Sequence, residues 1–260
     1  PKPSSAASDV YKRQLKEYAN TGYYPFHMPG HKRNTALIGS ELPYELDITE
    51  IDGFDDLHHA DGILKEEQER AARVFGAEES HFLVNGSTAG ILSAVMGCTR
   101  RGDRILVARH CHKSIYHAIY MNGLVPRYVY PEFDISMHMN GEISKEDVAK
   151  ALEAEPDIKA VVIVSPNYDG VVSDVKGIAE VVHSYGIPLI VDEAHGPHFG
   201  FHPAFPERAN DLGADVVINS LHKTLPSLTQ TAILHINGKF ANRRRIKKYL
   251  DMLQSSSPSY

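Results

Sequence analysis

The 260-residue chain contains no tryptophan and only two cysteines, Cys98 and Cys111. Two cysteines cannot build a disulfide scaffold, and they fit a reducing compartment such as the cytoplasm. No apolar run approaches the roughly 20 residues that a membrane-spanning helix needs. The charge imbalance is small, with 27 basic against 33 acidic side chains, whereas nucleic-acid binders need clustered basic residues. We therefore expect a cytoplasmic protein that binds neither membranes nor nucleic acids.

The two ends of the chain are polar. Residues 1–14 are aperiodic, and Asp9–Gln14 resembles a translated adaptor from sequencing-library preparation, so we set them aside as a scar. The stretch Gln254–Tyr260 is rich in serine. It is interpreted either as a tail or as a loop cut within a domain.

What the chain does contain is a regular alternation of apolar runs and helical segments. The expected strands are His81–Val84, Arg104–Ala108, Val125–Tyr130, Lys159–Ser165, Ile187–Val191, Val216–Asn219 and Ala232–Ile236. Helices are expected after the first four, ending near Cys98, Asn122, Ala154 and Tyr185. The alternation predicts an α/β fold, a mostly parallel sheet with helices on both faces. Ligands of such sheets bind at the C-terminal ends of the strands.

A lysine follows one of these expected strands, in the segment Ser220-Leu221-His222-Lys223-Thr224. Most lysines are exposed, whereas Lys223 is expected at the C-terminal edge of the sheet. The pKa of a lysine falls readily when the side chain is desolvated, which suits Schiff-base chemistry. The alternative is an ordinary loop lysine beside a capping serine.

Asp192 ends the most apolar strand, in the segment Asp192-Glu193-Ala194-His195-Gly196. An acid there must be paired or must emerge at a site, because an unpaired buried charge is costly. The alternative is that Asp192 caps the following turn.

Two other functions are weighed for this segment. Asp-Glu-Ala-His also occurs in helicases, but the chain has no phosphate loop carrying a lysine. The spacing of His195, His198 and His202 suits a metal site on a helix. Because glycines and prolines lie between and beside these histidines, a helix is disfavoured and we expect no metal.

The segment Asn85–Gly90 joins an expected strand to the start of a helix. Backbone N–H groups are unpaired at a helix start and the helix dipole favours an anion, so Ser87 and Thr88 are candidates for phosphate binding. A plain helix cap is the alternative.

Together these segments match the requirements of pyridoxal phosphate, which needs a lysine, an acid for its pyridine nitrogen and donors for its phosphate. Asp192 is expected to keep the ring nitrogen protonated, and Lys223 to hold the aldehyde carbon. His112 is expected to stack on the ring, unless it only bonds a backbone carbonyl. The expected phosphate contacts are Ser87, Thr88, Ser220 and His222.

The chain resembles the fold-type I pyridoxal-phosphate decarboxylases of ornithine, lysine and arginine, in the compact form without an N-terminal wing domain. The resemblance runs from about Tyr24 to Tyr260. It is carried by Phe26–Lys32, Leu46–His58, Asn85–Gly90, His112–Ser114, Asp192–Gly196 and Ser220–Pro226. His-Met-Pro-Gly-His-Lys and His-Lys-Ser are its most specific pieces.

The resemblance implies an aspartate-aminotransferase-like large domain over residues 61–260, without the smaller C-terminal domain of the family. It implies Lys223 as the Schiff-base lysine, Asp192 at the pyridine nitrogen and His195 near the ring oxygen. It also implies a stacking role for His112 and phosphate contacts from the four residues named above. Residues 15–60 would pack at the active site and dimer interface, and Tyr168–Gly170 would form a loop near the site. Ser255 and Ser256 would approach the phosphate site of a neighbouring subunit.

The implied reaction is decarboxylation of lysine, arginine or ornithine to the amine and carbon dioxide by a homo-oligomer. Polyamine synthesis and acid resistance both remain open as roles. Acids considered for the distal cation of the substrate are Glu50, Asp52, Asp55 and Asp56. Two alternatives stay open: another fold-type I enzyme, such as an aminotransferase or carbon–sulfur lyase, or a non-catalytic fragment.

Overall fold

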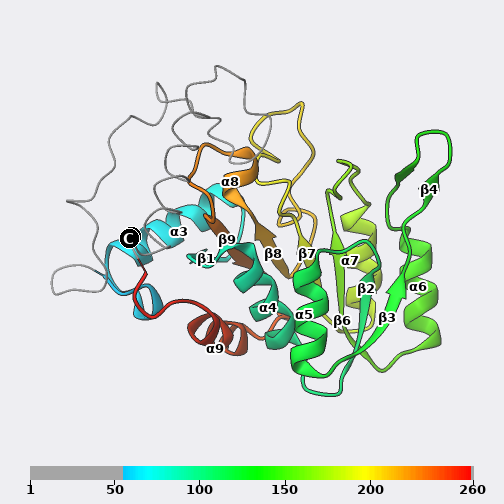
Figure 1. The fold of residues 1–260 in the computed structure, drawn as a ribbon, viewed down its shortest axis with the longest axis horizontal. Coiled ribbons are helices and arrows are strands. Elements are labelled where there is room, and N and C mark those ends of the chain that lie inside the picture. The colour runs from blue at the N-terminus through cyan, green and yellow to red at the C-terminus, as the bar shows by residue number, and fades with distance from the viewer. Residues whose placement is uncertain (1–54, 259–260) are drawn as a thin grey trace, which may run out of the picture.

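The computed structural model describes residues 55–258, which contain a seven-stranded sheet in the order β1-β9-β8-β7-β6-β2-β3 (Figure 1). The neighbours from β8 to β3 pair in parallel, whereas β9 is antiparallel to both β1 and β8. The prediction of a mostly parallel sheet is confirmed. The strands are β1 (Glu79–Leu83), β2 (Arg104–Ala108), β3 (Val125–Val129), β6 (Ile158–Val164), β7 (Leu189–Asp192), β8 (Val216–Asn219) and β9 (Ala232–Ile236).

Helices cover both faces of this sheet. They are α3 (Ile63–Phe75), α4 (Gly86–Cys98), α5 (Lys113–Asn122), α6 (Lys145–Ala154), α7 (Val175–Ser184), the four-residue α8 (Leu221–Thr224) and α9 (Arg243–Leu253), with a 3-10 turn at Leu57–His59. One apolar cluster contains buried side chains of α4, α5 and α9, and a second contains those of α6 and α7. Successive residues of β2 alternate between the clusters, because successive side chains of a strand point to opposite faces.

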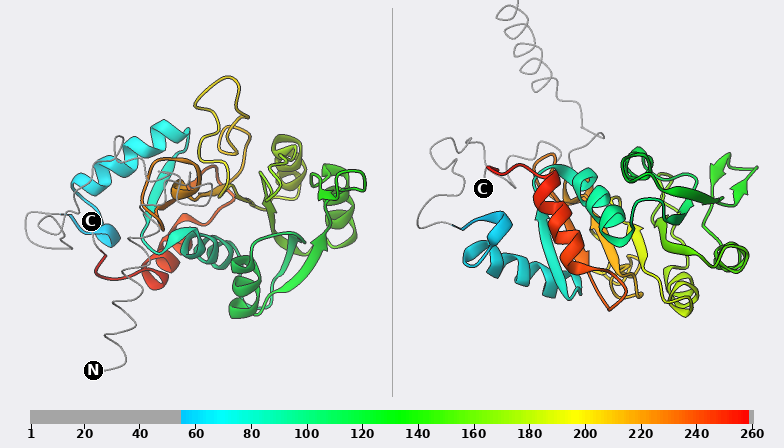
Figure 2. Two further views of the ribbon diagram at one scale, coloured as in Figure 1. Left: turned by 45° about the horizontal axis from the view of Figure 1, so that its top comes forward. Right: turned by 90° about the horizontal axis from the view of Figure 1, so that it is seen from below.

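The helix α9 lies beside α4 in both further views of the molecule (Figure 2). Gly97 permits this approach, since a Cβ atom there would lie 2.8 Å from Cα and 2.9 Å from the backbone N of Ile246. This contact holds α4 against the sheet. The first turn of α4 lies at the edge of the sheet where β1, β7 and β8 end and the loops after them begin.

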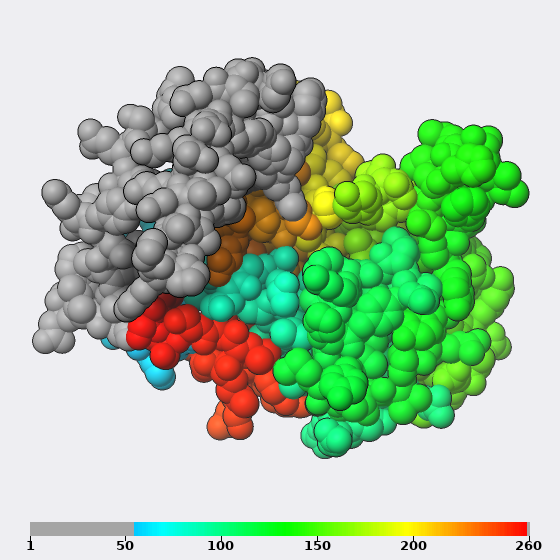
Figure 3. All heavy atoms as spheres, in the orientation of Figure 1, coloured from blue at the N-terminus to red at the C-terminus, as the bar shows by residue number. Residues whose placement is uncertain are grey.

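A hairpin of β4 (Phe133–Asp134) and β5 (Met139–Asn140) stands apart from the sheet and projects from the body of the molecule (Figure 3). No helix within residues 55–258 is long and apolar enough to cross a bilayer. Most of the expected N-terminal segment 15–60, with Glu50 and Asp52, lies outside the described residues.

Candidate active site

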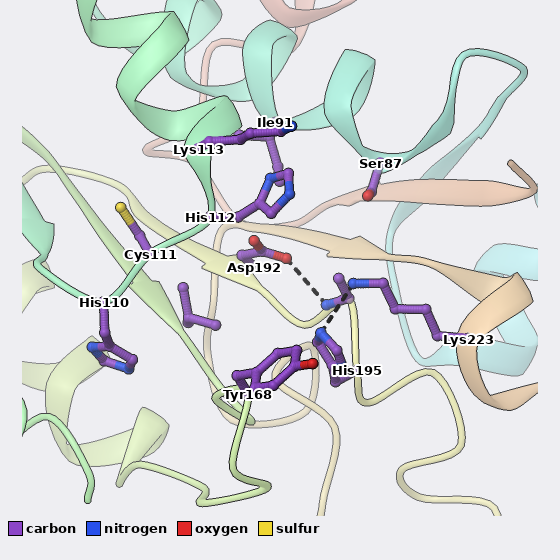
Figure 4. Close-up of a pocket in the computed structure, with 12 residues that line it drawn as sticks. Ser87, Ile91, His110, Cys111, His112, Lys113, Tyr168, Asp192, His195 and Lys223 are labelled. Atoms are coloured by element: carbon purple, nitrogen blue, oxygen red, sulfur yellow. Dashed lines mark hydrogen bonds between the residues drawn. The ribbon is translucent and has the colours of Figure 1, made fainter. Parts of the chain in front are cut away.

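A cavity of about 340 Å³ lies at the C-terminal ends of the parallel strands. Ile91, Val164 and Ala194 give it apolar walls. The polar residues that line it come from five places in the chain: Ser87 from α4, His112 from the start of α5, Tyr168 from the loop after β6, Asp192 and His195 from the end of β7, and Lys223 from α8 (Figure 4). The expected meeting of these segments at one sheet edge is what the structure shows.

Asp192 is buried at the floor of this cavity, with 3% of its surface exposed. Its Oδ1 accepts a hydrogen bond from the Ala194 backbone N at 3.1 Å, the one hydrogen bond that the carboxyl group makes among residues 55–258. Burial raises the pKa of Asp192 to about 6, although the charge of Lys223 lowers it in part. The carboxyl group therefore retains accepting capacity that faces the cavity.

Lys223 reaches across to His195, with its Nζ 3.0 Å from His195 Nε2. Burial lowers the pKa of Lys223, and the charge of Asp192 opposes this only in part. Burial, followed by the charge of Lys223, lowers the pKa of His195 to about 4. His195 is thus neutral near pH 7, and its Nε2 accepts the hydrogen bond that Lys223 donates. The ring of Tyr168 meets His195 edge to face at 5.9 Å.

His112 begins α5, and its side chain is fixed by the cap it makes. Its Nδ1 accepts a hydrogen bond from the Ser114 backbone N at 3.3 Å and lies 2.8 Å from Ser114 Oγ. Burial lowers its pKa, with a further contribution from the Lys223 charge. The ring lies on the opposite side of the cavity from His195, facing the Asp192 carboxyl (Figure 4).

The four residues expected to contact the phosphate, Ser87, Thr88, Ser220 and His222, differ in their position relative to the cavity. Ser87 lines the cavity and accepts a hydrogen bond from Ser220 Oγ at 2.8 Å. Thr88 is exposed and does not line the cavity. His222 also lies outside the lining, and its Nδ1 is 3.0 Å from the carbonyl oxygen of Thr231.

The first turn of α4 has free anion-binding capacity. Its N-cap residue, Asn85, makes no side-chain hydrogen bond to the helix. Asn85 Oδ1 accepts instead from the Ser255 backbone N at 2.9 Å. Uncapped N–H groups at a helix start attract an anion, so this turn beside Ser87 fits a phosphate group. Ser255 thus lies near the first turn of α4 of its own chain.

Asp55 and Asp56, which were considered for the distal cation of the substrate, do not line this cavity. Asp55 accepts hydrogen bonds from five backbone N–H groups at the start of α3, those of Asp56, Asp61, Gly62, Leu64 and Lys65. Although burial raises the pKa of Asp55, these backbone donors bring it down to about 2. Asp56 accepts from His58 N at 2.8 Å. The structure therefore places both carboxylates at a helix start, away from the cavity that would hold a substrate.

Three of the residues that line the cavity, His110, Cys111 and Lys113, were not proposed as site residues from the sequence. Their position beside His112 on the β2–α5 loop is the signal that could have identified them. Burial raises the pKa of Cys111 to about 11, so its thiol is not an activated nucleophile.

Among residues 55–258, no group of three potential ligands is arranged to hold a metal ion. His198 Nδ1 lies 3.2 Å from Thr224 Oγ1, and its ring packs against Phe199 and Phe205. His202 Nδ1 accepts from the Ala204 backbone N.

The side chains present fit pyridoxal phosphate. The cofactor requires a desolvated lysine, a buried acid and an anion-binding helix start within one cavity. Lys223, Asp192 and the first turn of α4 meet these needs, and the acid still has an unfilled acceptor position.

Comparison with known proteins identifies the family that the chain resembles. The profile described as "Orn/Lys/Arg decarboxylase, major domain" matches residues 10–260. An uncharacterised protein of Bacillus subtilis is 43% identical over 96% of this chain and 53% of its own length. An arginine decarboxylase of the same species is 38% identical over 95% of this chain and 51% of its own length. The chain thus spans about half the length of these curated relatives.

Solved structures show the same similarity. Lysine decarboxylase A from Pseudomonas aeruginosa superposes with a TM-score of 0.70 and 27% identity, covering 95% of this chain and 38% of that protein. An aminotransferase from Bacillus subtilis superposes with a TM-score of 0.58 at 17% identity, covering 74% of this chain and 46% of that protein, which indicates a shared fold.

Proposed function

Because the chain belongs to the Orn/Lys/Arg decarboxylase family, we propose that it forms the cofactor-binding part of a pyridoxal-phosphate-dependent decarboxylase of a basic amino acid. The observation that carries this proposal is the convergence of buried Asp192 and desolvated Lys223 in one cavity. Bound pyridoxal phosphate supplies an electron sink for the electron pair that remains when carbon dioxide leaves.

The residues of the site have separate roles in this proposal. Lys223 holds the cofactor through its aldehyde carbon. Asp192 accepts the hydrogen bond of a protonated pyridine nitrogen, which its position at the buried cavity floor supports. His112 offers a flat ring that its bond to Ser114 keeps in place. Ser87, Ser220 and the first turn of α4 bind the phosphate, with Thr88 and His222 as outer contributors.

Proton transfer is assigned to the Lys223–His195 pair. After carbon dioxide has left, the α-carbon of the substrate must receive a proton. We assign this donation to Lys223 Nζ, which lies 3.0 Å from neutral His195. His195 takes the role of a hydrogen-bond acceptor that orients Lys223, and its other ring nitrogen would be available to hold the ring oxygen of the cofactor.

The proposed substrates are arginine, lysine and ornithine, with arginine first. Relatives named arginine decarboxylases are 37–39% identical to this chain, and those named lysine decarboxylases are 27% identical. Asp192 is the one carboxylate that lines the cavity among residues 55–258. We therefore assign recognition of the distal cation of the substrate to groups outside the described residues or to a second copy, in a cytoplasmic homo-oligomer.

The proposal is tested by incubating the purified protein with pyridoxal phosphate and each amino acid, then measuring amine and carbon dioxide. Equal amounts of amine and carbon dioxide are expected, and turnover should fall by orders of magnitude in Asp192→Ala. A keto acid without carbon dioxide would instead identify an aminotransferase. Normal turnover in Asp192→Ala would refute the role of that residue.

A further inference from the structure

A buried polar pair lies between the two strand ends that carry the site. The end of β7 carries Asp192 and His195, and the end of β8 carries Ser220 and Lys223. Between them lie Glu193, with 3% of its surface exposed, and Asn219, with none. Neither side chain lines the cavity.

The contacts of this pair join three parts of the chain. Asn219 Nδ2 donates to Glu193 Oε2 at 3.0 Å and to the Glu193 backbone oxygen at 3.1 Å. The other carboxylate oxygen, Oε1, accepts from the Ala209 backbone N at 2.9 Å. The Glu193 carboxylate thus connects the end of β7 to the end of β8 and to the far end of the loop after Gly196.

The arrangement is costly, so it is not explained by packing alone. Burial raises the pKa of Glu193 to about 7, which measures how strongly its charge is desolvated. Asn219 Oδ1 is buried and has no partner among residues 55–258. Buried polar groups destabilise a fold unless they are hydrogen-bonded, and a buried hydrogen-bonded network holds its members in one geometry.

The two hydrogen bonds to the Glu193 side chain need both carboxylate oxygens as acceptors. The donors Ala209 N and Asn219 Nδ2 approach different oxygens of the same carboxylate. A glutamine has the same size but turns an NH₂ group toward one of the two donors. It can therefore complete both contacts only if the Asn219 amide turns over, which gives up the bond from Asn219 Nδ2 to the Glu193 backbone oxygen.

We propose that Glu193 and Asn219 are a positioning pair that fixes the ends of β7 and β8 relative to each other. In this way the pair holds Lys223 in contact with His195 and near Asp192. The importance of this geometry for catalysis rests on the proposed function. The geometry itself consists of contacts within the chain, among them the 3.0 Å contact of Lys223 with His195.

The opposite ends of the same two strands offer a matched control. Asp215, just before β8, is 2% exposed. Its Oδ2 accepts from the Leu189 backbone N at 2.8 Å and from His183 Nε2 at 2.8 Å. Asp215 therefore ties β7 to β8 as Glu193 does, but at the end away from the cavity.

The test measures the pKa of Lys223 in the cofactor-free chain by competitive amine acetylation over a pH series, with mass spectrometry of the Lys223 peptide. The variants are Glu193→Gln, Asn219→Ala and the control Asp215→Asn, each checked for folding by circular dichroism and urea unfolding. Loosening the strand ends admits water to the Lys223 ammonium group. We expect its pH midpoint to rise by about one unit in the first two variants and to stay unchanged in the control.

An unchanged midpoint in folded Glu193→Gln and Asn219→Ala would overturn the proposal, as would an equal rise in Asp215→Asn. The isosteric Glu193→Gln keeps the test usable if Asn219→Ala fails to fold. If the midpoint rises as expected but the purified protein releases no amine, the positioning pair stands and the proposed function fails. If the purified protein releases amine but the midpoint is unchanged in the variants, the proposed function stands and the positioning pair fails.

Discussion

At the scale of single residues, the cavity is built from groups whose burial costs stability. Asp192 has a desolvated carboxyl with one hydrogen bond, and Lys223 has a desolvated ammonium group. Such groups are retained at functional sites where they destabilise the fold. Removing them should stabilise the chain while abolishing the proposed chemistry.

Asp192→Asn tests this trade-off through the pH dependence of stability. The native-state pKa of Asp192, about 6, lies above its ordinary value of 3.8. The native state therefore binds this proton more tightly than the unfolded state, and wild-type stability falls as pH rises from about 4 to about 6. Asparagine removes that loss. We expect the variant to exceed the wild type by about 3 kcal/mol at pH 8, as an upper bound, in urea unfolding of the cofactor-free chains. A less stable variant at pH 8 would contradict this expectation.

The sequence predicts the location of the site better than its individual contacts. Lys223, Asp192 and His112 could be assigned to one sheet edge because each follows an apolar run, and the ends of parallel strands converge. The sequence could not predict the environment of His222. Its ring faces the carbonyl oxygen of Thr231, which lies on the other side of a turn. His110 lies on the same loop as His112, but the sequence does not show which side chains of a loop turn into a cavity.

At the scale of elements, the site depends on how α4 is held against the sheet and against α9. The sequence predicts α4 from its apolar run, and it misses α9, whose residues Arg243–Lys248 are almost all basic. The apolar side of α9 is carried by Ile246 and Leu250, which are buried in the cluster shared with α4. The antiparallel direction of β9 was also not predicted, because apolar runs carry no information on strand direction.

Gly97→Ala tests the α4–α9 contact. Within an open helix, alanine would be more favourable than glycine by up to about 1 kcal/mol. Here the added Cβ would meet the backbone of Ile246, so α9 must shift. We expect a loss of about 1–3 kcal/mol in the free energy of urea unfolding, with Glu180→Ala on the exposed side of α7 as a near-neutral control. A gain in stability would show that α9 is not held at this distance.

At the scale of the whole molecule, the fold contains a buried titratable group far from the proposed chemistry. His235 in β9 has no exposed surface, and its Nδ1 bonds Ser80 Oγ at 2.7 Å. Its Nε2 has no partner among residues 55–258. Burial lowers the pKa of His235 to about 3.

His235 should make the whole fold sensitive to acid. Because its native pKa lies below the ordinary value of 6.5, the unfolded state binds this proton more readily, and stability is lost as pH falls below about 6.5. Asparagine at this position cannot be protonated but can still bond Ser80. Between pH 7 and pH 5 we expect the wild type to lose about 2 kcal/mol more than His235→Asn, measured by urea unfolding. His117→Asn at an exposed site is the control. Equal losses in wild type and His235→Asn would remove His235 as the cause.

The central claim, that this cavity binds pyridoxal phosphate through Lys223, is tested most directly by chemical trapping. The purified folded chain is mixed with pyridoxal phosphate, reduced with borohydride and mapped by peptide mass spectrometry. One phosphopyridoxyl group is expected on Lys223 and none in Lys223→Ala. Modification spread over exposed lysines, or a folded chain with Lys223 unmodified, would contradict it.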